Sequence, residues 1–220
     1  MKSETANLAQ FVADLQFSKL PQDVVERTRL LVLAHVGIAL RARHAAALNS
    51  AMPDSLDVLG LTGGDAVVIG DERSYSPAAA AFYNGNLAHS LDFDDTHVAG
   101  VLHATCTAVP TLLAVGQRHA ISGREMLIAY LAAIEVDARI GMAATGGFHR
   151  KGFHPTGVVG AYGAAIAAGR AGGLTRAQLQ DAQGIVLGMA SGTLGFLDEG
   201  AWNKRLHAGW ASVVGITAAE

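Results

Sequence analysis

The sequence has almost no cysteine, because Cys106 is the single one among 220 residues. One thiol cannot form an internal disulfide, so the chain is expected to fold without one. The sequence also lacks the CxxC, HExxH, GxGxxG, GxxxxGKS and GxxxxGKT patterns. Zinc-ribbon, metalloprotease, dinucleotide-binding and P-loop chemistries therefore lose their usual sequence support.

Charge is also scarce, and neither sign dominates. Lys and Arg total 16 and Asp and Glu total 19, which gives a formal net charge of -3. This balance lacks the basic excess that binding to a phosphate backbone requires. We therefore expect no nucleic acid among the partners.

Long hydrophobic runs are missing as well. The longest apolar stretch near the start, residues 30–40, is interrupted by His35 and falls well short of the ~20 residues that cross a bilayer. Residues 1–5 lack the apolar stretch of a secretory signal. We therefore expect no membrane partner and a cytoplasmic location.

What the sequence does have is small apolar side chains. Half of it is hydrophobic and only 6% is aromatic, and there are 26 glycines, so the expected core consists mainly of Ala, Val, Leu and Ile. A chain of this length buries enough surface for a real core. Because no repeat or low-complexity linker divides it, we expect one mostly α-helical unit.

Apolar residues at helical spacing, prolines and capping patterns predict most of the elements. Pro77 and Pro110 are expected to begin helices, and Ser122 and Thr175 open capping-box patterns that begin two more. Residues 66–69 are β-prone and predict one short strand or hairpin. The expected helices are 8–15, 21–39, 77–89, 110–116, 126–140, 157–171, 179–189 and 210–220. Small residues on one face of helix 157–171 place it at the centre of the bundle.

Polar residues gather in three places on this apolar background. The segments are HSLDFDDTHVAGVLH at 89–103, GFHRKGFHPTG at 147–157 and WNKRLHAGW at 202–210. Each lies where the chain turns into or out of an apolar helix. Together they predict a pocket between helix ends, where cations and helix amino termini attract a carboxylate or phosphate.

Other interpretations of these residues stay open. Taken singly, the aspartates can cap helices, the histidines can be ordinary core or surface residues, and Lys204 with Arg205 can lie in a solvated loop. Cys106 can be a nucleophilic thiol, although a lone cysteine in an apolar run is more often part of the packing. A divalent metal is a further alternative. Its candidate ligands are His89, Asp92, Asp94, Asp95 and His97.

The three segments, in this order, resemble the MmgE/PrpD family. The resemblance extends from residue 20 to the final helix, and its members are dehydratases, decarboxylases and epimerases of small di- or tricarboxylic acids. The matching motifs are NGNLAHSLDFDDTH at 84–97, His103, EVDARIG at 135–141, GFHPTGVVGAYGAA at 152–165 and KRLHAGWA at 204–211.

The resemblance implies an all-α fold, a large multi-helix domain with at most one short β-hairpin. Residues 1–220 would form the amino-terminal portion of this domain, with a lid domain and a carboxy-terminal return absent from the chain. The resemblance also implies a homodimer, a small polycarboxylate substrate, and neither a metal nor an organic cofactor.

Active-site positions follow from the same resemblance. The implied catalytic residues are Asp92, His103, His154 and Lys204, and the implied substrate-binding residues are Thr96, His154 and Lys204. His207, in the same segment as Lys204, is expected to bind substrate as well. A further histidine and tyrosine would come from the lid, beyond this chain.

Removing a proton next to a carboxylate needs a base within hydrogen-bond reach and a fixed cation for the developing charge. We therefore expect His103 and His154 to transfer protons and Lys204 to bind a substrate carboxylate. Asp92 is expected to orient an imidazole, and Thr96 to donate a hydrogen bond. These roles predict a cofactor-independent lyase, either a dehydratase or a decarboxylase. An epimerase of a succinate-derived acid and a noncatalytic helical dimerisation fragment are the alternatives.

Overall fold

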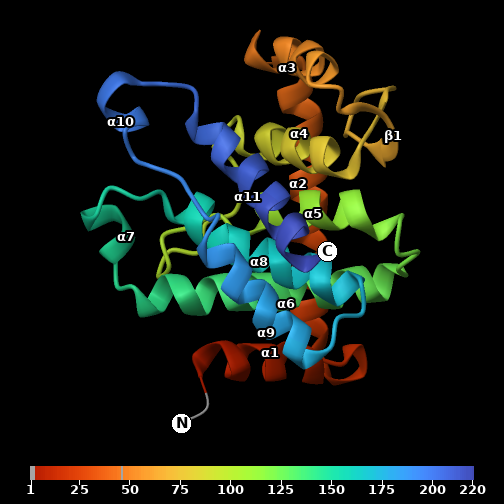
Figure 1. Ribbon diagram of the computed structural model, residues 1–220, viewed down its shortest axis with the longest axis vertical. Helices are drawn as coiled ribbons and strands as arrows, with labels where there is room; N and C mark the ends of the chain where they lie inside the picture. Colours follow the sequence, from red (N-terminus) through yellow and green to blue (C-terminus); the bar gives the residue numbers. More distant parts are fainter. Residues whose placement is uncertain (1–2, 46) are drawn as a thin grey trace.

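The computed structural model describes residues 3–45 and 47–220. Across these residues the fold is helical apart from one two-stranded sheet, which confirms the predicted all-α class with a short hairpin (Figure 1). No helix in the described part of the chain is long and apolar enough to cross a membrane. The elements are α1 (Glu4–Asp14), the 3-10 helix η1 (Phe17–Lys19), α2 (Gln22–Ala45), α3 (Ala47–Val58), β1 (Thr62–Val67), β2 (Ser74–Tyr75), α4 (Pro77–His89), α5 (Thr105–Gly116), α6 (Gly123–Ala143), α7 (Gly147–Arg150), α8 (Pro155–Ala171), α9 (Arg176–Leu187), α10 (Phe196–Glu199) and α11 (Lys204–Ala219).

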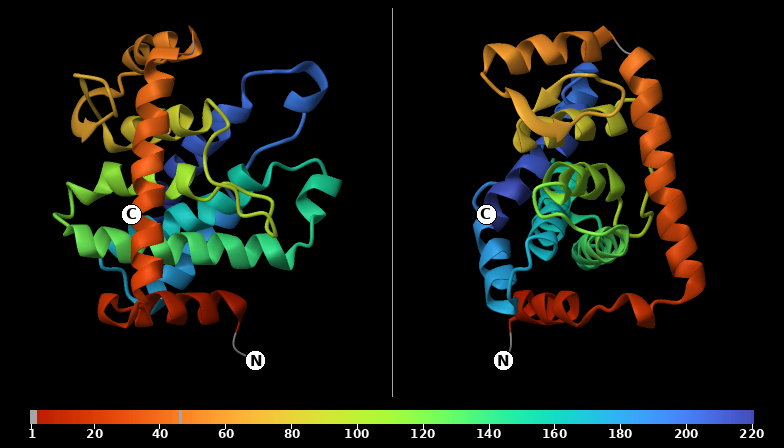
Figure 2. Two further views of the ribbon diagram at one scale, coloured as in Figure 1. Left: turned by 180° about the vertical axis from the view of Figure 1, so that it is seen from behind. Right: turned by 90° about the vertical axis from the view of Figure 1, so that its right-hand side faces the viewer.

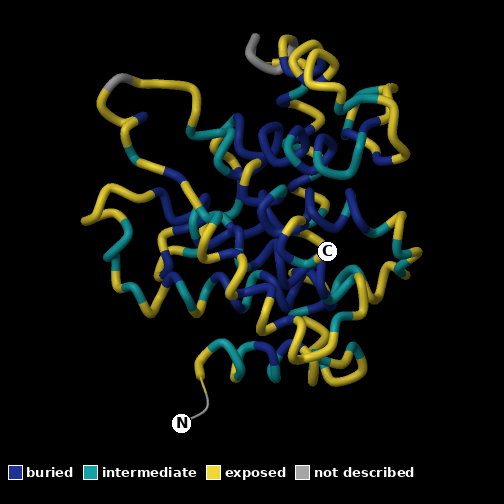
Figure 3. The backbone as a smooth tube through the Cα atoms, in the orientation of Figure 1, coloured by how far each residue is buried: buried dark blue, intermediate teal, exposed yellow. Residues whose placement is uncertain are grey.

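Helix α8 lies at the centre of the bundle, as its small residues predict. It packs against α5, α6 and α11, and the backbone there is buried (Figures 1 and 3). A Cβ atom on Gly160 would lie 2.7 Å from the side chain of Thr107 on α5, and one on Gly163 would lie 2.3 Å from Asp137 on α6. Glycine at these positions lets the neighbouring helices approach closely.

Local capping signals begin several helices where the sequence predicts them. Pro77 occupies the first turn of α4. Ser122 and Glu125 form a complete capping box at the start of α6, and Thr175 and Gln178 form another at the start of α9. In each box, two backbone N–H groups that the helix leaves free find side-chain acceptors.

The differences from the prediction include two helix starts and one helix that the sequence did not predict. The helix expected to begin at Pro110 begins at Thr105, with Pro110 inside it; α5 is buried almost throughout, so packing maintains the helix across the proline. The helix expected at 210–220 begins at Lys204, which places the third polar segment on α11 itself. Helix α3 has no counterpart among the predicted helices, because Pro53 inside it is a helix-breaking signal.

The predicted hairpin is present, formed by β1 and β2 in antiparallel register with an irregularity between Thr62 and Ala66. It begins earlier than the apolar run at 66–69. The side chain of Asn84 on α4 holds it in place, accepting from the Ile69 N–H and donating to the Val67 carbonyl, both at 2.9 Å.

A group of charged and polar residues also fixes the hairpin; we call Arg43, Asp71, Arg73 and Tyr75 the hairpin network. Asp71 accepts hydrogen bonds from Arg43 at 3.2 Å, from the Arg73 side chain at 2.9 and 3.0 Å, and from the Tyr75 hydroxyl at 3.0 Å. Burial acts to raise the pKa of Asp71, but hydrogen bonds from Arg73 and Tyr75 and the charge of Arg73 hold it well below its usual value. The carboxylate is therefore ionised and fully paired.

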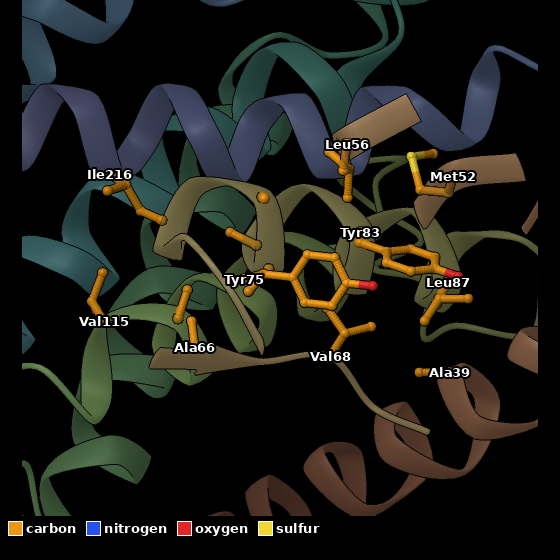
Figure 4. Packing of buried hydrophobic residues seen from close by; sticks show 14 of the residues in the cluster. Ala39, Met52, Leu56, Ala66, Val68, Tyr75, Tyr83, Leu87, Val115 and Ile216 are labelled. Carbon is orange, nitrogen blue, oxygen red and sulfur yellow. The ribbon is translucent and has the colours of Figure 1, made fainter. Parts of the chain in front are cut away.

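The hydrophobic core next to this network joins the hairpin to the helices around it. Tyr75 and Tyr83 meet edge to face with ring centroids 6.2 Å apart, and Leu56 and Met52 of α3 cover them (Figure 4). Helix α2 runs along one side of the molecule, from near α1 at one end to α3 at the other (Figure 2). Its buried side includes His35.

Candidate active site

The three polar segments meet at one cavity. The first segment follows α4, the second leads into α8, and the third begins α11. The short helices α7 and α10 lie on the same side of the molecule (Figure 1). The cavity has a volume of about 190 Å³. Its lining residues are Thr96, Val101, His103, His149, His154, Leu194, Phe196, Leu197 and Lys204.

The loop between α4 and α5 is tightly folded. The His97 N–H donates to the Leu102 carbonyl at 2.9 Å, and His97 Nδ1 accepts from the Gly100 N–H at 3.0 Å. Asp92 and Val101 both adopt positive φ, 58° and 53°, in the left-handed region that side chains other than glycine seldom occupy. Such backbone strain persists where surrounding structure enforces it, and it is common at functional sites.

His103 is held so that one ring nitrogen faces protein acceptors. Its Nδ1 lies 3.1 Å from the Asp95 carbonyl oxygen, 3.4 Å from Thr96 Oγ1 and 3.6 Å from an oxygen of Asp94. A carbonyl oxygen only accepts, so Nδ1 carries the proton and Nε2 keeps a lone pair. This tautomer makes His103 a suitable base toward the cavity that it lines.

His154 occupies the amino-terminal cap position of α8. Its Nδ1 lies 3.0 Å from Nδ1 of His207, and both rings contact Phe196. Burial and the neighbouring histidines and Lys204 lower the pKa of His154 to about 2, and burial lowers that of His207. Both rings are therefore neutral at pH 7, and one of the two Nδ1 atoms donates to the other.

A buried pair lies beside these two histidines. His89 Nδ1 donates to Asp94 Oδ2 at 2.7 Å, and both side chains are almost completely buried. The centroid of the His89 ring lies 5.0 Å from that of the His103 ring. The His89 ring also stacks on the His154 ring, with the centroids 5.6 Å apart. We call His89, Asp94, His103, His154 and His207 the imidazole cluster.

Lys204, the first residue of α11, supplies the cation at the cavity. Its ammonium group donates to a carboxylate oxygen of Asp92, and this hydrogen bond is the main cause of a lowered pKa of Asp92. The side chains are 24% and 63% exposed, so the pair is open to solvent on the Asp92 side. A substrate carboxylate can therefore replace Asp92 as the partner of Lys204.

The structure thus brings Thr96, His103, His154 and Lys204 to one cavity, whereas Asp92 and His207 are not among its lining residues. Asp92 has a different partner from the expected imidazole, because its hydrogen bond is with Lys204. His207 lies behind His154. The catalytic and substrate-binding roles of these residues stay predictions.

Sequence reasoning missed two parts of this site. The apolar wall formed by Leu194, Phe196 and Leu197 carries no polar pattern that would mark it. For His89 and Asp94 individually, the sequence predicts no role other than that of possible metal ligands. Their position against His103 depends on how the strained loop turns.

The structure also bears on the two alternative interpretations, a metal site and a nucleophilic thiol at Cys106. Among the described residues, His89, Asp94 and Cys106 are the group whose ligand atoms lie within 4.8 Å of one another, and it contains only two of the five expected ligands. The atoms have hydrogen-bonding partners, His89 with Asp94 and the Cys106 thiol with the His103 carbonyl at 3.2 Å. Burial raises the pKa of Cys106 well above its usual value, so the thiol is protonated and a poor nucleophile.

Comparison with known proteins finds one matching family model and several similar curated proteins. Residues 6–220 match the model of the MmgE/PrpD N-terminal domain. Similar curated proteins are the cis-aconitate decarboxylase-like protein oryM of Aspergillus oryzae, 30% identical over 219 residues, and the cis-aconitate decarboxylases of Aspergillus terreus, 30% over 225 residues, and Homo sapiens, 29% over 230 residues. These alignments cover 93%, 96% and 100% of this chain but 44%, 44% and 46% of the relatives, so the chain spans less than half of each.

Proposed function

The chain belongs to the MmgE/PrpD family, and on that premise we propose that the protein containing it is a lyase that decarboxylates a small di- or tricarboxylic acid without a bound cofactor. One observation carries the proposal. His103, with its Nδ1 hydrogen-bonded to protein, the neutral His154 and Lys204 line the same cavity of about 190 Å³. The decarboxylases among its relatives support the reaction class.

The chemistry of decarboxylation explains why these groups are useful together. The bond between one carboxylate carbon and its neighbour breaks, carbon dioxide leaves, and the electron pair left behind must receive a proton at carbon. Lys204 binds a carboxylate that the substrate retains and stabilises negative charge in the transition state. His103 Nε2 takes up a proton from solvent and then delivers it to that carbon.

A dehydratase would use the same groups differently. His103 would remove a proton from the carbon next to a carboxylate and pass it to a hydroxyl group on the adjacent carbon, which would leave as water, and an alkene would form. An epimerase is the second candidate, because His103, His149 and His154 line the cavity, and imidazoles there can remove a proton from one face of a carbon while a proton from solvent returns on the other.

Deuterated water separates these reactions. Full-length protein is incubated with cis-aconitate, citrate-like acids and succinate-derived acids, and carbon dioxide, alkene absorbance and deuterium uptake are measured. A decarboxylase releases carbon dioxide and places one deuterium at the vacated carbon. A dehydratase gives an absorbing alkene without carbon dioxide, and an epimerase gives deuterium uptake without net conversion.

Matched variants decide whether the cavity is responsible. Lys204→Met and His103→Gln should both strongly reduce the rate of the reaction, whereas Arg118→Gln, a change of an exposed cation just beyond the carboxy-terminal end of α5, should leave it unchanged. Full activity in a strong chelator is expected for a cofactor-independent reaction. Absence of turnover for every acid, together with no ligand-induced thermal stabilisation, would contradict an enzyme and favour the noncatalytic fragment.

The remaining family-based expectations enter as part of this proposal. We propose a homodimer of the full-length protein in the cytoplasm. Size-exclusion chromatography with light scattering measures the mass of the assembly. A monomer at micromolar concentration would contradict the proposed dimer.

A further inference from the structure

Two members of the imidazole cluster contact His103 but do not line the cavity. Asp94 Oδ2 lies 2.7 Å from His89 Nδ1 and 3.6 Å from His103 Nδ1. The side chains of His89 and Asp94 are 0% and 3% exposed, so neither is placed to touch a substrate. A buried charge is costly unless it is paired and hydrogen-bonded, and the partner of Asp94 is His89.

We propose that Asp94, held in place by His89, is a positioning residue that stabilises the protonated form of His103. This inference rests on the proposed function, in which His103 gives a proton to the substrate and takes it back. Asp94 acts only through the His103 ring.

The carboxylate of Asp94 is the charge that acts on His103. Burial acts to raise the pKa of Asp94, but the hydrogen bond from His89 and the charges of His89 and His103 bring it below its usual value. Asp94 is therefore an anion near the ring. When His103 Nε2 gains a proton, the new positive charge lies beside that anion in a poorly solvated site, where the attraction is stronger than in water.

Hydrogen bonding fixes the geometry of this interaction. His103 Nδ1 keeps its proton on the Asp95 carbonyl, and the backbone N–H of His103 donates to Thr156 Oγ1 at 3.1 Å. The ring therefore cannot turn without breaking the hydrogen bond from Nδ1 to the Asp95 carbonyl. His89 Nδ1 donates to Asp94 Oδ2 and so holds the carboxylate beside the ring.

Other ionisable groups around His103 do not replace Asp94. Burial raises the pKa of Asp95, which favours its neutral form, and Asp92 is paired with Lys204. Asp94 is thus the ionised carboxylate closest to the ring. The ionisable groups that face His103 from its own loop and from the packed elements are Asp92, Asp94 and Asp95 of the loop, His89 of α4, Cys106 of α5, His154 of α8 and Lys204 of α11.

The test measures the pKa of His103 directly in the full-length protein. NMR of protein with ¹³C-labelled histidine follows each ring, and His103→Gln identifies the His103 signal by its loss. Asp94→Asn should lower the pKa of His103 by roughly one unit or more, because an anion within a few ångströms is removed. The part of the pH–rate profile that reports protonation of His103 should move to lower pH by the same amount. The kcat should fall about 10- to 100-fold, with KM nearly unchanged.

Two variants of His89 separate its hydrogen bond from its ring. His89→Asn keeps a donor near the position of Nδ1 and should retain most of the wild-type pKa of His103. His89→Phe keeps the ring but removes the donor, and should shift the pKa of His103 in the same direction as Asp94→Asn. These two variants also decide the matter if Asp94→Asn does not fold.

Asp71→Asn is the matched control, since Asp71 is an equally buried carboxylate in the hairpin network. It should lower thermal stability and leave the titration of His103 unchanged. If Asp94→Asn also lowers only the stability, with the pKa of His103 and the pH profile unaltered, Asp94 has a structural role and the inference is wrong. If wild-type protein turns over none of the acids, the proposed function fails, while the NMR titration still tests the contact between Asp94 and His103.

Discussion

Asp71 and Asp94 are both buried carboxylates, with side chains 4% and 3% exposed, but their surroundings differ. Asp71 accepts hydrogen bonds on both oxygens from two arginines and a tyrosine. Asp94 binds His89 through Oδ2, and its Oδ1 has no hydrogen-bond partner among the described residues.

The difference separates a structural site from a candidate functional one. A fully paired charge network rigidifies the fold, whereas a partly paired one costs stability and persists where it serves another purpose. The contrast is confined to the two carboxylates, because His89 Nε2 and Arg43 Nε of the hairpin network are both buried without a hydrogen-bond partner among the described residues. The comparison predicts that changes near the cavity reduce turnover and that changes in the hairpin network reduce stability.

The largest effect is expected at the cavity. Lys204→Met should lower kcat/KM about 10²- to 10³-fold, because the cation that stabilises the substrate carboxylate and the transition state is lost. The free energy of unfolding should change by less than about 1 kcal/mol, since the pair with Asp92 is open to solvent. Steady-state kinetics and urea unfolding measure the two quantities.

Lys204→Arg is the control for this variant, and it should recover part of the activity because it keeps the charge. A Lys204→Met protein that unfolds much more easily but turns over normally would reverse the comparison.

The next effect is expected in the hairpin network. Asp71→Asn should lower the free energy of unfolding by about 3 kcal/mol, because two arginines lose their buried partner. Activity per folded molecule should stay the same. The exposed Asp65 on the same hairpin provides the control, and Asp65→Asn should have little effect.

The stabilisation by Asp71 depends on pH in a defined direction. The pKa of Asp71 is held below its unfolded value, so its contribution is present above about pH 4 and is lost as pH falls further. Unfolding midpoints measured from pH 7 to pH 3 should therefore converge for wild type and Asp71→Asn. A constant difference across this range would contradict ionic pairing at Asp71.

The capping boxes and the small-residue face of α8 explain how much of the fold local sequence predicts. Ser122 with Glu125 and Thr175 with Gln178 act within one turn, so their effect does not depend on distant packing. The start of α5 depends on packing against other helices, which overrides Pro110. Local signals are therefore reliable where the interaction itself is local.

The same distinction applies to the candidate site. Polar segments predict that His103, His154 and Lys204 lie near a common pocket, and they do line one cavity. They do not predict which aspartate faces His103, because the left-handed turn at Asp92 directs the adjacent carboxylates to different places. Apolar residues such as Phe196 have no signal that distinguishes a cavity wall from the core.

A third buried carboxylate sharpens the comparison. Asp137 accepts the Gly163 N–H at 2.8 Å, and burial raises its pKa well above the usual value, so it is neutral in the folded protein. Because the unfolded chain releases this proton above about pH 4, the stability of the wild type falls as pH rises.

Asp137→Asn removes this titration and keeps an acceptor for the Gly163 N–H. Relative to wild type, the variant should gain stability as pH rises from 5 to 7, by at most about 1.4 kcal/mol per pH unit. Chemical unfolding at the two pH values measures the difference. Asp137→Leu, which lacks the acceptor, is the contrasting variant and should be destabilised at both.

The smallest effect concerns a histidine outside the imidazole cluster. His35 on α2 is buried, neither ring nitrogen has a hydrogen-bond partner among the described residues, and burial lowers its pKa to about 4. Its unfolded pKa is about 6.5, so protonation favours the unfolded chain and stability falls as pH decreases below that value.

His35→Leu should flatten this dependence, so that the variant gains about 2 kcal/mol relative to wild type between pH 6.5 and pH 5. His44→Gln, a change of an exposed histidine on the same helix, is the matched control and should follow the wild type. Turnover should be unaffected by either change at pH 7. If His35→Leu instead reduced turnover and left the pH dependence of unfolding unchanged, His35 would belong with the histidines of the cavity rather than with the apolar core.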